Sequence, residues 1–91
     1  MMNTNKVILY GFDECPYCDK LKDKYNEGNI KYDYVNINTY DGKELKKLFT
    51  IAKTDSVPII LINKSILSPE ISFKSIDEAY NLTIKILDNN N

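Results

Sequence analysis

The sequence predicts a small α/β domain with a central four-stranded mixed sheet flanked by about three helices, in the order β-α-β-α-β-β-α. Short, continuously apolar runs, which are typical of buried strands, alternate with longer segments whose apolar residues recur at helical spacing. A tight-turn signal, Asn63-Lys64, joins the last two strands and makes them antiparallel neighbours. A chain of 91 residues is long enough for one such domain. We expect the domain to cover residues 1–91, with an ordered core from about 6 to 88.

The first half of the chain is predicted to form a strand, a helix and a second strand. Residues 7–10 are apolar and form the first strand, and a loop of residues 11–14 follows. A helix begins at Cys15 or Pro16, because proline suits a first helical position, and it ends at Gly28. The inward face of this helix should carry Cys18, Leu21 and Tyr25. Residues 31–38 form the second strand, parallel to the first because such crossovers are right-handed.

A second helix begins near residue 41. Asp41 and Glu44 have the spacing of a capping box, which marks a helix N-terminus. The apolar residues that follow recur at i, i+3, i+4 and i+7 and should form one buried stripe: Leu45, Leu48, Phe49 and Ala52.

The end of the chain is predicted to be a strand pair and a third helix. The third strand covers residues 59–62, after Val57-Pro58, and a short fourth strand covers residues 65–67. Ser75 and Glu78 repeat the capping-box spacing and open the last helix. The residues expected to face inward on it are Ile76, Ala79, Tyr80, Thr83 and Leu87.

The segment Cys15-Pro16-Tyr17-Cys18 bears most directly on function, because it holds the only two cysteines of the chain. It lies where a strand leads into a helix N-terminus, whose free N–H groups and dipole favour a thiolate. The C-x-x-C spacing can lower a thiol pKa from about 8.5 to roughly 3.5–7.5. The pair therefore predicts disulfide exchange, with Cys15 as the more exposed nucleophile and the more buried Cys18 as the resolving thiol.

Other interpretations of the cysteine pair are weaker. A zinc site needs about four ligands, and this chain has two cysteines and no histidine. A structural disulfide that closes so short a loop would restrict the unfolded chain little. Inert thiols, and half of a metal or cluster site shared between subunits, stay as alternatives.

Bulk composition argues against several classes of partner. The net charge of −1 favours neither nucleic acid nor a membrane surface, and no apolar run approaches the ~20 residues of a membrane span. Residues 1–6 are polar, and the apolar run after them is too short for a signal peptide. We expect a cytoplasmic, reducing setting, where a lone cysteine pair is more often catalytic than structural.

The chain resembles the dithiol glutaredoxins, which have a thioredoxin-like fold. Three features carry the resemblance over nearly the whole length. They are C-P-Y-C at residues 15–18, Ser56-Val57-Pro58 before the third strand, and the β-β-α ending. Ser56-Val57-Pro58 resembles the T-V-P motif of that family, whose proline is cis and faces the active-site disulfide.

The resemblance implies a glutathione-dependent thiol-disulfide oxidoreductase that reduces protein disulfides and glutathione mixed disulfides. Glutathione would be the co-substrate, paired with the backbone of Val57, and no metal is expected. The family's γ-glutamyl site maps onto Ser75 and Asp77. The residues expected to bind substrate or glutathione are Pro16, Tyr17, Ser56, Val57, Pro58, Ser75 and Asp77. Partners would be disulfide-containing proteins, with ribonucleotide reductase suggested on family grounds, and the chain would act as a monomer without nucleic acid or membrane.

The chain also departs from the family pattern. Phe12 stands where members usually carry a lysine, and Asp55 stands where a basic or amide residue often precedes T-V-P. No glycine follows Gly42, so the Gly-Gly kink after the fourth strand is missing, and residues 68–73 resemble an insertion. Lys53 is one candidate for the missing cation.

Two other functions stay open, and the departures favour the first of them. The first is a glutaredoxin-like electron donor recharged by thioredoxin reductase. The second is a dimer that binds a [2Fe–2S] cluster through Cys15 and two glutathiones.

Charged residues also surround the nucleophile. Asp13 and Glu14 should oppose the thiolate, while Lys20 and Lys22 partly offset them. We therefore expect the pKa of Cys15 to be lowered, but less than in members with a lysine before the site.

Overall fold

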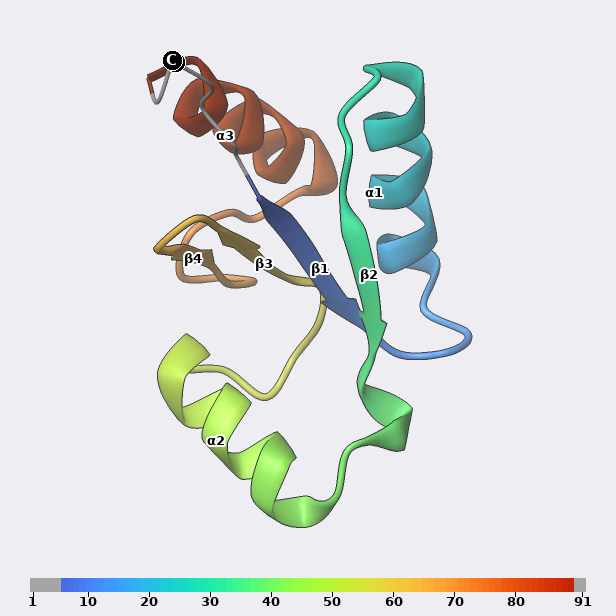
Figure 1. The fold of residues 1–91 in the computed structure, drawn as a ribbon, viewed down its shortest axis with the longest axis vertical. Helices are drawn as coiled ribbons and strands as arrows, with labels where there is room; N and C mark the ends of the chain where they lie inside the picture. The colour runs from blue at the N-terminus through green and yellow to red at the C-terminus, as the bar shows by residue number, and fades with distance from the viewer. Residues whose placement is uncertain (1–5, 90–91) are drawn as a thin grey trace.

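A computed structural model describes residues 6–89 and confirms the predicted order of elements (Figure 1). In chain order they are β1 (Val7–Gly11), α1 (Pro16–Glu27), β2 (Asp33–Asn36), the 3-10 turn η1 (Ile37–Thr39), α2 (Gly42–Ala52), β3 (Ile59–Ile62), β4 (Ser65–Leu67) and α3 (Ile76–Asn89). The ends of the expected 1–91 domain, including the polar N-terminus, lie outside the described residues. Between residues 6 and 89, no helix is long and apolar enough to cross a membrane.

The four strands form one mixed sheet in the order β2-β1-β3-β4. β1 and β2 are parallel, as the predicted crossover requires, while β3 runs antiparallel to both β1 and β4. In the register, Leu9 of β1 lies opposite Tyr34 of β2 and Ile60 of β3. The two central strands, β1 and β3, are the continuously apolar runs, because each is paired on both sides within the sheet.

One face of the sheet is covered by α1 and α3, and the core lies between them and the strands. Its members include Leu9, Ile60 and Ile62 from the sheet and Leu21 and Tyr25 from α1, all fully buried. Tyr32 and Tyr34 pack against the same cluster, so the tyrosines of β2 and the segment before it serve packing. The end of α1 contacts α3 in this layer, through Tyr25 with Thr83 and Lys24 with Asp77.

Tyr25 and Thr83 form the polar link between α1 and α3. The Tyr25 hydroxyl lies 2.8 Å from Thr83 Oγ1, and the Thr83 hydroxyl donates to the carbonyl of Ala79 at 2.8 Å. Tyr25 therefore donates and Thr83 accepts. The Tyr25 ring also lies 5.3 Å from the ring of Tyr32 and 6.2 Å from that of Tyr80, between centroids.

α2 lies apart from α1 and α3, toward the end of the sheet where β1 and β2 finish (Figure 1). It begins with the predicted capping box: Asp41 accepts from Glu44 N–H at 2.8 Å, and Glu44 accepts from Asp41 N–H at 3.3 Å. Of the predicted buried stripe only Ala52 is fully buried, and Leu45, Leu48 and Phe49 are half-buried. The prediction of a buried stripe was therefore wrong for three of its four residues, which keep partial exposure to solvent.

The second strand is shorter than predicted. It covers Asp33–Asn36 instead of residues 31–38, because the chain turns into η1 at Ile37. The Asn36 side chain stabilises this turn by accepting from Asn38 N–H at 2.9 Å. Such a local side-chain bond competes with continuation of the strand.

α1 ends next to Gly28, as predicted, but Gly28 has a φ of −87° and is not the left-handed residue. Asn29, with a φ of 57°, takes the left-handed conformation. Gly28 serves a different purpose, since a Cβ there would collide with the Tyr80 side chain of α3. A larger residue at position 28 would therefore force the Tyr80 side chain to move.

Tyr25 also makes stability depend on pH in the alkaline range. Burial raises the pKa of Tyr25 to about 12, and its hydrogen bond to Thr83 opposes this only in part. In the unfolded chain the Tyr25 phenol loses its proton near pH ~10. The stabilisation that this phenol gives the folded state is therefore complete below that pH and is lost as pH rises toward 12. We expect Tyr25→Phe to cost about 1 kcal/mol of unfolding free energy at pH 7. The variant should then lose less stability than wild type between pH 10 and 12.

Urea unfolding at a series of pH values checks this expectation. Tyr17→Phe is the matched control, because the Tyr17 ring is 65% exposed and makes no such contact. If Tyr25→Phe and wild type lost the same free energy of unfolding between pH 10 and 12, the pH dependence would not come from Tyr25.

Candidate functional site

The cysteine segment forms the N-terminus of α1, as the sequence predicted. Cys15 is the N-cap, in extended conformation with φ −109° and ψ 101°, and Pro16 is the first helical residue. The Cys15 Sγ accepts a hydrogen bond from Cys18 N–H at 3.2 Å. A sulfur placed there faces the free N–H groups of the first turn, which stabilise negative charge on it.

Cys15 and Cys18 are joined by a disulfide, with their Cα atoms 5.2 Å apart. That separation lies within the range disulfides adopt. Cys15 is 9% exposed, whereas Cys18 is completely buried. Cys15 is therefore the sulfur that an incoming molecule can reach.

Gly11, the last residue of β1, allows α1 to approach the sheet closely. A Cβ on Gly11 would lie 2.8 Å from Cys18 Sγ and 2.5 Å from the Tyr34 hydroxyl oxygen. Both contacts are shorter than side-chain carbon atoms tolerate. Cys18 and Tyr34 thus occupy the space that any larger residue at position 11 would need.

Polar contacts from β2 and η1 hold the loop of residues 12–14 that leads into Cys15. The Tyr34 hydroxyl donates to the carbonyl of Phe12 at 3.0 Å. Asp13 N–H donates to Asn38 Oδ1 at 2.7 Å, and the Asn36 amide donates to the Asp13 carboxylate. Burial, followed by the nearby carboxylates of Asp19 and Asp13, raises the pKa of Tyr34, so the phenol stays a donor.

The charges near the nucleophile are arranged differently from the expectation. Lys22 lies 3.5 Å from the Asp19 carboxylate, and its ammonium lies 3.7 Å from the centroid of the Tyr34 ring. Lys22 is thus held against α1 and β2, and Asp13 is held by Asn36. The lowered pKa of Cys15 stays a prediction.

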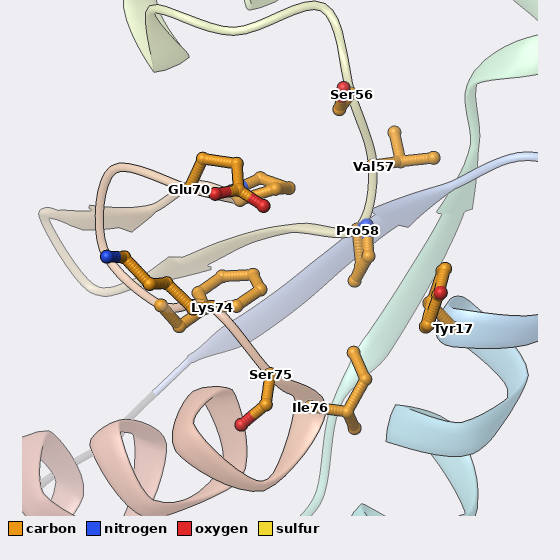
Figure 2. A pocket seen from close by; sticks show the side chains of 10 residues that line it. Tyr17, Ser56, Val57, Pro58, Glu70, Lys74, Ser75 and Ile76 are labelled. Atoms are coloured by element: carbon orange, nitrogen blue, oxygen red, sulfur yellow. The ribbon is translucent and has the colours of Figure 1, made fainter.

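A cavity of about 330 Å³ begins beside the cysteine segment. Its lining consists of Tyr17 together with residues 56–58, 69–70 and 73–76. Figure 2 shows Tyr17 at the start of α1 on one side, the turn with Glu70 and Lys74 on the other, and Pro58 between them. Pro58, Phe73 and Ile76 are buried, so the floor of the cavity is apolar.

The Ser56-Val57-Pro58 segment forms one wall of this cavity. The Val57–Pro58 peptide bond is cis, as the family resemblance implied. In the part of the chain that the structure describes, neither the N–H nor the C=O of Val57 makes a hydrogen bond. Both groups are free to pair with an extended ligand in the cavity.

The structure does not bring Asp77 to the cavity. Its carboxylate lies 2.7 Å from Lys24 Nζ on α1, and the hydrogen bond and charge of Lys24 lower the pKa of Asp77. Ser75 lines the cavity, but its hydroxyl caps α3 by accepting from Glu78 N–H at 3.1 Å. Glu78 in turn accepts from Lys74 N–H at 2.8 Å, one residue earlier than a standard capping box.

Two charged residues of the cavity were not among the predicted site residues, namely Glu70 and Lys74. The candidate cation, Lys53, lies instead at the left-handed C-cap of α2, outside the cavity lining. One indication of Glu70 was present in the sequence, namely that residues 68–73 resemble an insertion relative to the family pattern. Sequence reasoning also missed Gly11, Asn36 and Asn38, whose roles depend on packing.

Comparison with known proteins gives three findings. Residues 7–67 match the glutaredoxin family. An uncharacterised glutaredoxin-like 8.6 kDa protein of the rubredoxin operon of Clostridium pasteurianum is 33% identical over 62 residues, covering 67% of this chain and 80% of that protein. Among solved structures, oxidised glutaredoxin 2 of Chlamydomonas reinhardtii superposes with a TM-score of 0.65 at 28% identity, covering 93% of this chain and 78% of the other. The structure of the buckwheat glutaredoxin–glutathione complex superposes with a TM-score of 0.66 at 16% identity. The match covers 97% of this chain and 74% of the buckwheat chain.

The close approach at Gly11 predicts the effect of a single methyl group. Gly11→Ala should lower the free energy of unfolding by about 1–3 kcal/mol, because Cys18 or Tyr34 must move. In a Tyr34→Phe background the same change should cost less, because one of the two colliding atoms is gone.

Urea unfolding of the oxidised proteins measures both effects. Gly42→Ala is the matched control, since a Cβ on Gly42 meets nothing within 4 Å. Equal stability of Gly11→Ala and Gly42→Ala would show that the described packing around Cys18 is wrong.

Proposed function

This chain belongs to the glutaredoxin family, and we propose that it is a glutathione-dependent thiol-disulfide oxidoreductase with a dithiol mechanism. Its substrates would be protein disulfides and mixed disulfides between proteins and glutathione. Family membership already makes it a thiol-disulfide redox protein with a C-x-x-C active site. The proposal adds glutathione as co-substrate and assigns the roles of individual residues.

One arrangement carries the proposal: the cavity that leads from Tyr17 past the free backbone groups of Val57 to the start of α3. A peptide-like thiol lying along Val57 would pair with its N–H and C=O while its sulfur reaches toward Cys15. A structural relative, buckwheat glutaredoxin, was solved as a complex with glutathione. We propose that glutathione contacts Pro16, Tyr17, Ser56, Val57 and Pro58 here.

In the first step, the Cys15 thiolate attacks one sulfur of the substrate disulfide. A new S–S bond forms to Cys15, and the other substrate sulfur leaves as a thiolate that takes a proton from water. Cys15 is assigned this role because it is the more accessible member of the pair and its sulfur faces Cys18 N–H.

In the second step, Cys18 loses its proton and attacks the sulfur of Cys15. The Cys15–Cys18 bond forms, the second substrate thiol leaves, and two electrons have passed to the substrate. A first glutathione then opens the disulfide at Cys15. A second glutathione attacks the resulting mixed disulfide, releasing glutathione disulfide and the reduced pair.

A second candidate is recharging by thioredoxin reductase instead of glutathione. It is favoured by Phe12, which stands where the family usually has a lysine and whose carbonyl is held by Tyr34. It is also favoured by the 68–73 turn, which replaces the Gly-Gly kink. The two candidates share the chemistry of Cys15 and Cys18 and differ only in the reductant.

The choice of reductant can be measured directly. Reduction of hydroxyethyl disulfide is followed by NADPH consumption, with either glutathione plus glutathione reductase or thioredoxin reductase alone. We expect turnover with the glutathione couple and little with thioredoxin reductase. The reverse result would move the protein to the second candidate while keeping its cysteine chemistry.

Substitution of the cysteines separates their roles. Cys15→Ser should abolish all exchange. Cys18→Ser should abolish reduction of protein disulfides, such as those of insulin, but still remove glutathione from a glutathionylated peptide, which needs one thiol. If Cys18→Ser were inactive in that one-thiol reaction, Cys15 would not be the nucleophile.

A further inference from the structure

The Tyr34 hydroxyl lies close to the sulfur of Cys18. A Cβ on Gly11 would lie 2.5 Å from the Tyr34 hydroxyl oxygen and 2.8 Å from Cys18 Sγ, so both atoms border one small space. The two atoms are therefore no farther apart than the sum of these distances. Tyr34 belongs to β2 and Cys18 to α1, so the packing of α1 on the sheet brings them together. In the disulfide form, the part of the chain that the structure describes has no hydrogen bond between them.

A hydrogen-bond donor would help Cys18 to attack Cys15. The attacking form is the thiolate, and Cys18 is completely buried, where water cannot stabilise the charge. Two N–H groups of the first helical turn already serve Cys15. Cys18 N–H donates to Cys15 Sγ at 3.2 Å, and Asp19 N–H donates to the Cys15 carbonyl at 3.0 Å. A donor from another element would therefore favour ionisation of Cys18.

Tyr34 keeps its proton and is packed from both sides. Burial raises the pKa of Tyr34, and the nearby carboxylates of Asp19 and Asp13 raise it further. Tyr32 adds a smaller contribution of the same sign. On the α1 side, the Lys22 ammonium lies 3.7 Å from the centroid of the Tyr34 ring. The phenol therefore stays a donor at neutral pH.

The hydroxyl gains a second acceptor once the disulfide opens. In the disulfide form it donates to the Phe12 carbonyl at 3.0 Å. Hydrogen bonds to a charged acceptor are about twice as strong as those to a neutral one, so a thiolate on Cys18 would compete with this carbonyl for the Tyr34 proton. Rotation of the hydroxyl about its C–O bond redirects that proton without moving the ring.

We propose that Tyr34 is a positioning residue for the second step, in which its hydroxyl donates a hydrogen bond to the Cys18 thiolate. This inference rests on the proposed function, because it takes Cys18 as the resolving thiol. The Tyr34 proton is not transferred. Cys18 gives its own proton to water, the Cys15–Cys18 bond forms, and the bond from Cys15 to the substrate sulfur breaks. The substrate thiolate that leaves takes a proton from water, so the step is balanced.

The two cysteines can be followed separately with dithiobis(nitrobenzoate), an aromatic disulfide that releases a coloured thiolate. When it is mixed in excess with the reduced protein, attack by Cys15 releases the first coloured thiolate at a rate proportional to the reagent concentration. Attack by Cys18 on the resulting mixed disulfide releases the second at a rate independent of that concentration. Both phases are measured by stopped-flow absorbance between pH 6 and 9.

Two substitutions change the Tyr34 hydroxyl in opposite directions. Tyr34→Phe removes it, and fluorotyrosine at position 34, fluorinated beside the hydroxyl, keeps it as a more acidic and stronger donor. Tyr32→Phe is the matched control. Tyr32 is also a partly buried tyrosine that packs against the core, and its hydroxyl makes no hydrogen bond among the described residues.

We expect Tyr34→Phe to slow the second phase about threefold at pH 7 and to move its pH–rate curve about half a pH unit higher. The loss is smaller than the roughly tenfold change in ionisation, because a less acidic thiol is also a stronger nucleophile. Fluorotyrosine should speed the second phase by up to about twofold and move the curve lower. The first phase of each variant, and both phases of Tyr32→Phe, should stay within about twofold of wild type.

Three results would overturn the role of Tyr34. One is a second phase in Tyr34→Phe that matches wild type at every pH. Another is equal slowing by phenylalanine and by fluorotyrosine, which would show that the fit of the ring matters and its proton does not. The third is equal slowing of both phases in Tyr34→Phe, which would trace the effect to the lost anchor of the Phe12 carbonyl. If wild type released only one coloured thiolate, the dithiol mechanism itself would fail, a result distinct from these three.

Discussion

The arrangement of the site depends on how closely the start of α1 approaches the end of β1. Gly11 has no Cβ, and Cys18 Sγ and the Tyr34 hydroxyl fill the space that a Cβ would need. This close packing buries Cys18 while Cys15, one turn earlier, keeps limited access to solvent. The proposed division of roles, with Cys15 as nucleophile and Cys18 as resolving thiol, rests on this difference in burial.

The same contact region also sets where the disulfide lies relative to the cavity. Tyr34, Asn36 and Asn38 hold the loop before Cys15. On the opposite side, α1 is joined to α3 by the Tyr25–Thr83 hydrogen bond and the exposed Lys24–Asp77 ion pair. Exposed pairs of this kind stabilise little, so the buried tyrosine is the stronger link. The start of α1 and the start of α3 both contribute to the cavity wall, through Tyr17 and through Ser75 and Ile76.

The 68–74 turn brings two charged residues, Glu70 and Lys74, to the cavity. Its backbone is closed by hydrogen bonds of its own and is tied to α2 through Ser68. The turn follows β4 and leads into α3. In the proposed function, the apolar floor and the free backbone of Val57 bind a peptide-like thiol.

Features set by neighbouring residues were predictable from the sequence, and features set by packing were not. The Cys15 cap with Pro16 after it, the Asp41–Glu44 capping box and the Asn63-Lys64 turn each depend on a few adjacent residues, so they appeared where predicted. The end of β2 was misjudged because a side-chain bond from Asn36 replaced strand pairing. Asp77 was assigned to ligand binding, but the packing of α1 against α3 places Lys24 beside it. The sequence by itself determined the redox pair and its place at a helix N-terminus, because those rest on local chemistry. Only the tertiary structure decided which charges reach the cavity, because that depends on contacts between segments far apart in the chain.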